Sequence, residues 1–201
     1  MKRTELINRI INKYSFKKYL EIGIFDGGNF NAINVDEKYS VDPTFPARFK
    51  MTSDQFFENM SQHPMDSGWD VVFVDGMHTA GQAHRDIVNS LQHLNDGGFI
   101  VVHDCNPENE WATRPPDEYK RGEVWNGDVY KAFIKFKQEH PELTCITVDT
   151  DYGCGVITNR FKNLTEYATL GPIDYVTWDH FDKNRAELLG LTSVDDFKEL
   201  I

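Results

Sequence analysis

Residues 69–76 of the chain read Trp-Asp-Val-Val-Phe-Val-Asp-Gly, and this stretch decides the fold class. It is apolar and rich in β-branched residues, which is typical of a strand buried in the middle of a sheet. Gly76 ends the predicted strand, and Thr79 is a candidate cap for the helix that follows. A buried strand followed by an amphipathic helix is the repeating unit of an α/β layer fold. The apolar stripe of this helix is formed by Ala83, Ile87, Leu91 and Leu94.

The same alternation of strand and helix patterns continues on both sides of this unit. An amphipathic helix is predicted from Thr4, a candidate N-cap, to about Ile11. The glycines at 97–98 are expected to end the helix that starts near Thr79. Residues 150–153 predict the turn of a hairpin. Further strands are predicted over 18–23, 39–42, 99–102, 143–149 and 154–158, and a further helix over 129–139.

The composition supports one globular domain and excludes several classes of protein. Of 201 residues, 40% are hydrophobic and 26% are charged, which is ordinary for a single domain. The mean hydropathy is −0.52, and no apolar run approaches ~18 residues, so we expect no membrane partner. Three widely spaced cysteines and the absence of a secretory signal predict a reducing, cytoplasmic location. The net charge of −11, from 21 basic and 32 acidic residues, opposes a nucleic-acid partner.

A glycine-rich turn follows the first predicted strand and carries Glu21, Gly23 and Gly27. Glycines in such a turn let a ligand approach the backbone closely. The spacing is not the G-x-G-x-x-G of dinucleotide-binding folds, and a carboxylate before the first glycine suits a ligand with a cationic amino group. Asp42 ends the next predicted strand, where a carboxylate could accept hydrogen bonds from both hydroxyls of a ribose. The two features together predict a nucleoside-containing ligand at this edge.

Five segments occur in order along the chain: EIGIFDGG (21–28), VDP (41–43), TSDQFF (52–57), VVFVDGMH (71–78) and LNDGGFIVVHD (94–104). Together they resemble the class I S-adenosylmethionine-dependent methyltransferases, in the small-molecule O-methyltransferase branch (methyltransferase family 24-like). The resemblance covers about residues 19–158. It implies a Rossmann-like three-layer α/β sandwich. The sheet would have seven strands, mostly parallel, with an antiparallel strand in a C-terminal hairpin.

The resemblance also implies S-adenosylmethionine as the cofactor and assigns its contacts. The residues so assigned to cofactor binding are Glu21, Gly23, Gly27, Asp42, Ser53, Asp54 and Asp75. Ser53 and Asp54 would lie near the adenine, in the loop after the third strand position. Two alternatives stay open, because Asp54 could cap or begin a helix and Asp42 could be a turn carboxylate before Pro43. A carboxylate inside an apolar strand needs a reason to be there, which favours the cofactor role of Glu21.

Two acidic residues, Asp75 and Asp104, end neighbouring predicted strands at the edge where open α/β sheets bind ligands. Similarity to metal-dependent O-methyltransferases implies that they hold Mg²⁺ or another divalent metal, which would lower the pKa of a substrate hydroxyl. His103 is the third candidate metal ligand. It replaces a residue that is acidic in many relatives, and an imidazole would favour a softer ion. Alternatively, strand alternation lets His103 point into the core.

His78 follows Asp75 by three residues and is the candidate general base. A neutral imidazole beside a substrate hydroxyl can take its proton as a methyl group arrives. The D-x-x-H spacing is similar to that of some metal-dependent sugar O-methyltransferases. The alternative is that His78 only begins a helix. The next charged residues, 84–86, are expected to lie on a solvated helix face.

Residues 105–128 are polar, proline-rich and without periodicity, which predicts a lid or substrate loop. Its aromatic side chains could stack on a sugar ring or a flat acceptor, or pin the loop to the domain. Asn126 and Asp128 are interpreted as caps of the following helix. The aromatic residues in question are Trp111, Tyr119 and Trp125.

We therefore expect an S-adenosylmethionine-dependent methyltransferase that acts on a hydroxyl of a small molecule, such as a sugar or glycoside. The methyltransferase domain would span 1–160, and 161–201 would form a helical and loop extension packed on it. An inactive S-adenosylmethionine-binding module and a metal-free methyltransferase of a biosynthetic cluster are the alternatives. The glycine spacing disfavours a nicotinamide-dependent oxidoreductase, and D-G-M-H at 75–78 disfavours a nucleic-acid methyltransferase. The expected partner is a small-molecule acceptor, and a homo-oligomer stays open.

Overall fold

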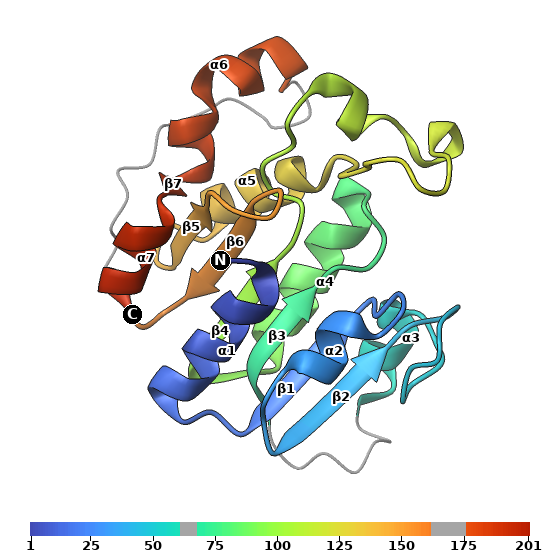
Figure 1. Ribbon diagram of the computed structural model, residues 1–201, viewed down its shortest axis with the longest axis vertical. Coiled ribbons are helices and arrows are strands. Elements are labelled where there is room, and N and C mark those ends of the chain that lie inside the picture. Colours follow the sequence, from blue (N-terminus) through green and yellow to red (C-terminus); the bar gives the residue numbers. More distant parts are fainter. Residues whose placement is uncertain (61–67, 162–175) are drawn as a thin grey trace.

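The computed structural model describes residues 1–60, 68–161 and 176–201, which form a seven-stranded sheet with helices on both faces (Figure 1). None of the helices in these ranges is long and apolar enough to cross a membrane. The strands are β1 (Lys18–Ile22), β2 (Glu37–Val41), β3 (Trp69–Val74), β4 (Leu94–Val102), β5 (Thr144–Val148), β6 (Cys154–Thr158) and β7 (Leu191–Thr192). The helices are α1 (Arg3–Tyr14), α2 (Gly28–Ala32), α3 (Ser53–Glu58), α4 (Ala80–Gln92), α5 (Val129–Glu139), α6 (Trp178–Leu189) and α7 (Val194–Leu200).

The sheet runs in the order β2-β1-β3-β4-β6-β5-β7. Only β6 runs against the others, because it is antiparallel to both of its neighbours while every other pair is parallel. The β5–β6 hairpin lies where the sequence predicts it. The predicted fold class, a mostly parallel Rossmann-like sheet with an antiparallel strand in a C-terminal hairpin, is confirmed.

The alternation of side chains along the central strand builds two separate cores. Val71 and Phe73 of β3 point into the core under α1, α2 and α7, whereas Val72 and Val74 point into the core under α3, α4, α5 and α6. This strand is apolar on both faces because helices cover both faces of the sheet, as in other parallel sheets. β3 reaches solvent only at its ends. The polar residues that follow Val74 therefore lie at the carboxyl edge of the sheet.

The seventh strand has a different origin from the one that the resemblance suggests. Between β2 and α3 the chain forms only an isolated bridge, Val41–Phe49, and not a strand. Ser53 and Asp54 lie in the first turn of α3, which Thr52 caps by accepting from Gln55 N–H. The sheet is completed instead by β7, which pairs with β5. Part of the predicted C-terminal extension, 162–175, lies outside the described residues.

Two predicted boundaries were wrong for physical reasons. Thr4 lies inside α1 and does not cap it; its hydroxyl donates to Asn29 at 2.6 Å. Leu94 and the glycines after it belong to β4 and not to the end of α4. A Cβ on Gly98 would lie 2.8 Å from the carbonyl oxygen of Asp70, so glycine here permits the close approach of β4 to β3.

Candidate active site at the carboxyl edge of β3 and β4

Parallel pairing brings the ends of β3 and β4 to one edge of the sheet. Val74 is paired with Val102, and Asp75 and Asp104 follow these residues at the same edge. β4 has ended before His103, and Asp104 has a positive φ of 62°. The alternation of a strand therefore no longer applies, and His103 and Asp104 can turn toward the same cluster. The alternative that His103 points into the apolar core is not what the structure shows, since both of its ring nitrogens face charged groups.

His78 lies between the two aspartates. Its Nε2 is 3.4 Å from Oδ1 of Asp75, and its Nδ1 is 3.1 Å from Oδ2 of Asp104. Nδ1 is also 3.0 Å from the carbonyl oxygen of Trp125. A carbonyl oxygen only accepts, so Nδ1 carries the proton. Burial opposes the charge on the ring, but Asp75 and Asp104 outweigh it and raise the pKa of His78 to about 9.

His103 contacts the same two carboxylates from the other side. Its Nδ1 is 3.3 Å from Oδ1 of Asp75 and 3.3 Å from Oδ1 of Asp104. Its Nε2 lies 2.7 Å from Nη1 of Arg3 and 3.7 Å from Oδ2 of Asp151. Burial lowers the pKa of His103, but the carboxylates of Asp75 and Asp104 outweigh burial and raise it overall. The guanidinium of Arg3 at Nε2 opposes this rise because it favours the neutral ring. Despite its own burial, Asp75 has a pKa below its usual range, because both histidines stabilise its charge.

The end of the predicted lid is attached to His78 at several points. The backbone N–H of Asp128 donates to the carbonyl of His78 at 3.2 Å. Gly127, at φ 59°, packs so closely that a Cβ would lie 1.7 Å from the same carbonyl oxygen. Asn126 is buried and donates to Oδ1 of Asp104 at 2.5 Å. The segment Trp125–Asp128 therefore belongs to the cluster.

The interpretation of Asn126 and Asp128 as caps of α5 was wrong. Asp128 occupies the N-cap position without capping α5, and its carboxylate instead accepts from the N–H of Ala80 at 2.6 Å, which caps α4. The sequence signal for this role was present but weak: an Asn-Gly-Asp run before a helix, with a glycine that can adopt positive φ. Its partners, 22 residues away for Asn126 and 48 for Asp128, could not be identified from spacing.

An aromatic stack extends from His78 into the lid. The rings of His78 and Trp125 lie 5.1 Å apart at 21°, and those of Trp125 and Tyr119 lie 4.9 Å apart at 21°. Arg114 is buried under the loop and donates to the carbonyls of Trp111 and Val124. Trp111 and Tyr119 remain exposed. The loop is thus held by its own polar contacts, and the exposed ring of Tyr119 ends the stack that begins at His78.

The glycine-rich turn adjoins the cluster through its backbone. Gly23 has a φ of 83°, and a Cβ there would lie 2.2 Å from the carbonyl oxygen of Asp75. Glu21 is buried and accepts from the hydroxyl of Tyr19 at 2.5 Å and from Asn29 at 2.9 Å. Burial raises the pKa of Glu21 to about 7, only partly offset by these hydrogen bonds, and Asp75 adds to the rise. A cationic amino group beside this carboxyl would stabilise its ionised form.

Asp42 lies at the end of β2 as predicted. Its Oδ2 accepts from the N–H of Ile24 at 3.1 Å, and its Oδ1 accepts from Thr44 and Phe45, both at 2.8 Å. These bonds fix the carboxylate and tie the glycine-rich turn to β2. An ionised carboxylate has about four lone-pair positions, so about one remains for a ribose hydroxyl. Gly27 lies in the same turn as the N-cap of α2, at φ 79°.

Ser53 and Asp54 lie apart from the acidic cluster, on α3. Gln82 of α4 donates to Ser53 at 3.1 Å, to Asp54 at 3.2 Å and to Asp86 at 2.9 Å. The expectation that Asp86 lies on a solvated face was wrong: it is fully buried, and its Oδ2 is unpartnered. Burial raises the pKa of Asp86 to about 6, although the bonds from Ser53 and Gln82 lower it.

The donor set can be tested for its fit to a divalent cation. Ligand atoms of Asp75, His78 and Asp104 lie within 4.8 Å of one another, which is one coordination sphere. The two carboxylates suit ions such as Mg²⁺ or Mn²⁺, and the imidazole of His78 lies beside them. The residues therefore fit a divalent cation.

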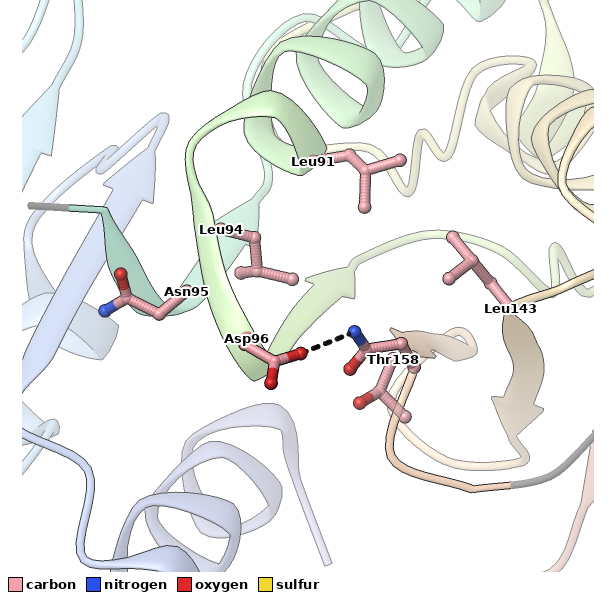
Figure 2. A pocket seen from close by; sticks show the side chains of 7 residues that line it. Leu91, Leu94, Asn95, Asp96, Leu143 and Thr158 are labelled. Atoms are coloured by element: carbon pink, nitrogen blue, oxygen red, sulfur yellow. Dashed lines mark hydrogen bonds between the residues drawn. The ribbon is translucent and has the colours of Figure 1, made fainter.

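A pocket lies at the opposite end of β4 and takes no part in this cluster (Figure 2). Asp96 accepts from Asn159 at 3.0 Å on its rim. None of the predicted site residues lines it. Its lining residues are Leu91, Leu94, Asn95, Asp96, Leu143, Thr158 and Asn159.

The chain matches one family model and is similar to several solved structures. Residues 15–105 match a family model described as a methyltransferase domain, whereas no curated protein matches the chain. An O-methyltransferase from Bacillus cereus, in complex with SAH, is similar in structure at 10% identity and a TM-score of 0.59, covering 77% of this chain and 79% of that chain. TomG, an O-methyltransferase from Streptomyces achromogenes in complex with SAM, gives 15% identity and 0.54, covering 77% and 78%.

A third similar structure is the MycE methyltransferase of the mycinamycin biosynthetic pathway, in complex with Mg and SAH. It gives 14% identity and a TM-score of 0.50, covering 83% of this chain and 52% of that chain. At these identities the structures establish a shared fold, and the family match adds the domain. Residues 15–105 of the chain therefore match a methyltransferase domain, and the chain shares the fold of these methyltransferases.

Proposed function

We propose that the chain transfers a methyl group from S-adenosylmethionine to a hydroxyl of a small molecule, such as a sugar or glycoside, with help from a divalent cation. The observation that carries this proposal is the contact of Gly23 with the backbone of Asp75. It places the glycine-rich turn and the cluster of Asp75, His78 and Asp104 at one edge of the sheet. A methyl donor in the turn and an acceptor at the cluster would then be neighbours.

Glu21, Asp42 and the turn at Gly23–Gly27 are proposed to hold the cofactor. The fixed carboxylate of Asp42 would accept from a ribose hydroxyl, and Glu21 would face the cationic amino group. Ser53 and Asp54 are proposed to lie at the adenine side, where Gln82 already organises them. When bound, S-adenosylmethionine supplies an electrophilic methyl group on a sulfonium.

His78 is proposed as the base. As the acceptor oxygen took the methyl group from the bound cofactor, its hydroxyl proton would pass to Nε2 of His78, because Nδ1 is committed to Trp125 and Asp104. A base must start neutral, whereas Asp75 and Asp104 hold His78 protonated. Neutralising these carboxylates returns the ring toward the form that the reaction needs. When bound there, a divalent cation supplies that positive charge and stabilises the developing alkoxide.

The aromatic stack is proposed to receive the acceptor. Trp125 lies against His78, the exposed Tyr119 stacks on Trp125, and Trp111 is exposed on the same loop. Rings of this kind pack on the apolar faces of sugars and on planar groups. A neutral or cationic acceptor also suits a chain with a net charge of −11.

A metal-free methyltransferase is the second candidate. It is supported by the way His78, His103 and Asn126 already satisfy the carboxylates of Asp75 and Asp104. Activity that survives removal of divalent ions by EDTA would favour it.

The test is formation of S-adenosylhomocysteine from S-adenosylmethionine and Mg²⁺ with a panel of glycosides and phenols, each paired with its O-methylated form. We expect turnover with at least one free hydroxyl compound and none with its blocked counterpart. His84→Gln is the matched control for His78→Gln, since His84 pairs with Glu139 away from the cluster. Cofactor binding without turnover on any acceptor would contradict the proposal and favour an inactive binding module.

A further inference from the structure

We infer that Thr4, in the first turn of α1, is a positioning residue for the amino end of the cofactor and acts on Glu21 through the side chain of Asn29. This inference rests on the proposed function, because it concerns the cofactor contact that is proposed for Glu21. The hydroxyl of Thr4 donates to Oδ1 of Asn29 at 2.6 Å, and Nδ2 of Asn29 donates to Oε2 of Glu21 at 2.9 Å. One chain of hydrogen bonds thus runs from the first helix to β1.

The direction of these hydrogen bonds follows from the chemistry of the two ends. An ionised carboxylate only accepts, so Glu21 requires the amide NH₂ of Asn29 and not its oxygen. The oxygen of Asn29 then faces Thr4, whose hydroxyl can donate to it. With the amide reversed, its oxygen would point at the carboxylate. The hydroxyl of Thr4 therefore stabilises the one orientation of Asn29 in which Glu21 receives a donor.

Asn29 also determines which oxygen of Glu21 is left for a ligand. Its Nδ2 lies 3.3 Å from the hydroxyl oxygen of Tyr19, and this hydroxyl donates to Oε2 of Glu21 at 2.5 Å. Both donors therefore meet at Oε2, and no residue in the described ranges donates to Oε1. The bond from Asn29 also lowers the pKa of Glu21 against the rise that burial causes. An ionised Glu21 with Oε1 uncommitted suits a primary ammonium group.

Thr4 is held in place by the residues around it. The backbone N–H and the guanidinium of Arg3 both contact Oδ2 of Asp151 at 3.0 Å, in the turn between β5 and β6. Thr150 of the same turn donates to the backbone carbonyl of Met1. In the first turn of a helix, a threonine has no carbonyl one turn earlier in that helix to bond. The hydroxyl of Thr4 is therefore committed to Asn29, and α1 becomes part of the cofactor site.

The test compares two ligands that differ only in the amino group. Calorimetric titration gives the Kd of S-adenosylhomocysteine and that of 4-(5′-adenosylthio)butanoate, which is the same molecule without its amino group. We expect Thr4→Val to raise the Kd of S-adenosylhomocysteine by about 3–10-fold, the usual contribution of one hydrogen bond, and to leave that of the deamino analogue unchanged. Thr4→Ser keeps the hydroxyl and should bind both ligands as the wild type does.

Asn8→Ala is the matched control for a change in how α1 packs. Asn8 lies on the same helix, donates to the carbonyl of Ala32 and accepts from the N–H of Asn34, and it does not contact Asn29. We expect this variant to leave the ratio of the two Kd values unchanged. An equal loss of both ligands in Thr4→Val, or the same selective loss in Asn8→Ala, would overturn the inference, because either result would mean that Thr4 only attaches α1 to the domain.

A double variant tests whether Thr4 acts through Asn29. Asn29→Ala alone should weaken S-adenosylhomocysteine selectively, and adding Thr4→Val should cause no further loss, because its partner is already absent. Additive losses would contradict the inference. Failure of the proposed function would appear differently, since the wild type would then bind neither ligand, or would bind both and transfer no methyl group.

Discussion

The Nδ1 atom of His78 lies 3.0 Å from the backbone carbonyl oxygen of Trp125, 47 residues further along the chain. This bond attaches the loop 105–128 to the candidate active site and, together with Oδ2 of Asp104, favours a proton on Nδ1 of His78. A backbone acceptor cannot be removed by a side-chain substitution at Trp125. The tautomer is therefore set by where the lid backbone lies, and Gly127 and Asp128 determine that position through their contacts with the His78 carbonyl.

His78→Ala should lower kcat by about 10²–10⁴-fold, the usual contribution of a general base, and leave the Kd for S-adenosylhomocysteine nearly unchanged. The reason is that His78 is proposed to touch the acceptor and not the cofactor. Steady-state kinetics and calorimetry measure the two quantities, with His84→Ala as the control. A large loss of cofactor affinity in His78→Ala would instead assign the ring to cofactor binding.

Gly127→Ala should lower kcat by about 10²-fold, because its Cβ would lie 1.7 Å from the His78 carbonyl oxygen and must displace it. Gly122→Ala separates this effect from backbone strain. Gly122 also has a positive φ, of 96°, but nothing lies within 4 Å of its Cβ position. Gly122→Ala should lose about 1–2 kcal/mol of stability through its positive φ, and Gly127→Ala should lose more because the clash adds to the backbone strain. Equal activity in the two variants would show that the lid does not position His78.

Asp42→Asn should raise the Kd for S-adenosylhomocysteine by about 10–100-fold, since a charge-assisted hydrogen bond to a ribose hydroxyl contributes about 1.5–3 kcal/mol. The readout is the increase in Tm on adding the ligand, compared between variant and wild type. Asp36→Asn is the matched control, because Asp36 forms an exposed ion pair with Lys17. If the ligand raised the Tm of Asp42→Asn as much as that of the wild type, Asp42 would not contact the ribose.

Asp86→Asn should make the free energy of unfolding less dependent on pH. The folded pKa of Asp86 is raised to about 6 from 3.8, so the stabilising protonated form is fully present below about pH 4 and its contribution is lost as the pH rises through about 6. Two pKa units correspond to roughly 3 kcal/mol. Urea unfolding at about pH 4 and about pH 8 should show this loss in the wild type and a smaller one in Asp86→Asn. An identical pH profile for both proteins would contradict burial of the ionised carboxyl.

The sequence was sufficient to predict the place of a site residue where that place follows from the strand the residue ends. The β-branched run before Asp75 and the apolar run before His103 had to be buried, so the acidic residues after them had to meet at one edge. The same holds for Asp42 after β2. Adjacent parallel strands then brought Asp75 and Asp104 together without any further information.

The sequence was insufficient where a contact joins distant segments. Arg3 reaches His103 from the first helix, and Asn126 reaches Asp104 from the lid, although neither has a distinctive local pattern. Asp86 was wrongly predicted to be solvated, because it is an acidic residue beside Arg85 in the sequence. Only the packing of α4 against the sheet, beside Gly76, buries it.

The most direct test of the central claim is an anomalous difference map from crystals grown with MnCl₂ and S-adenosylhomocysteine. We predict one strong manganese peak ligated by the carboxylates of Asp75 and Asp104, with the ribose of the ligand at Asp42 along the same edge. S-adenosylhomocysteine at Asp42 without a manganese peak would contradict the cation-assisted mechanism. Ligand density away from the Gly23–Gly27 turn would contradict the account as a whole.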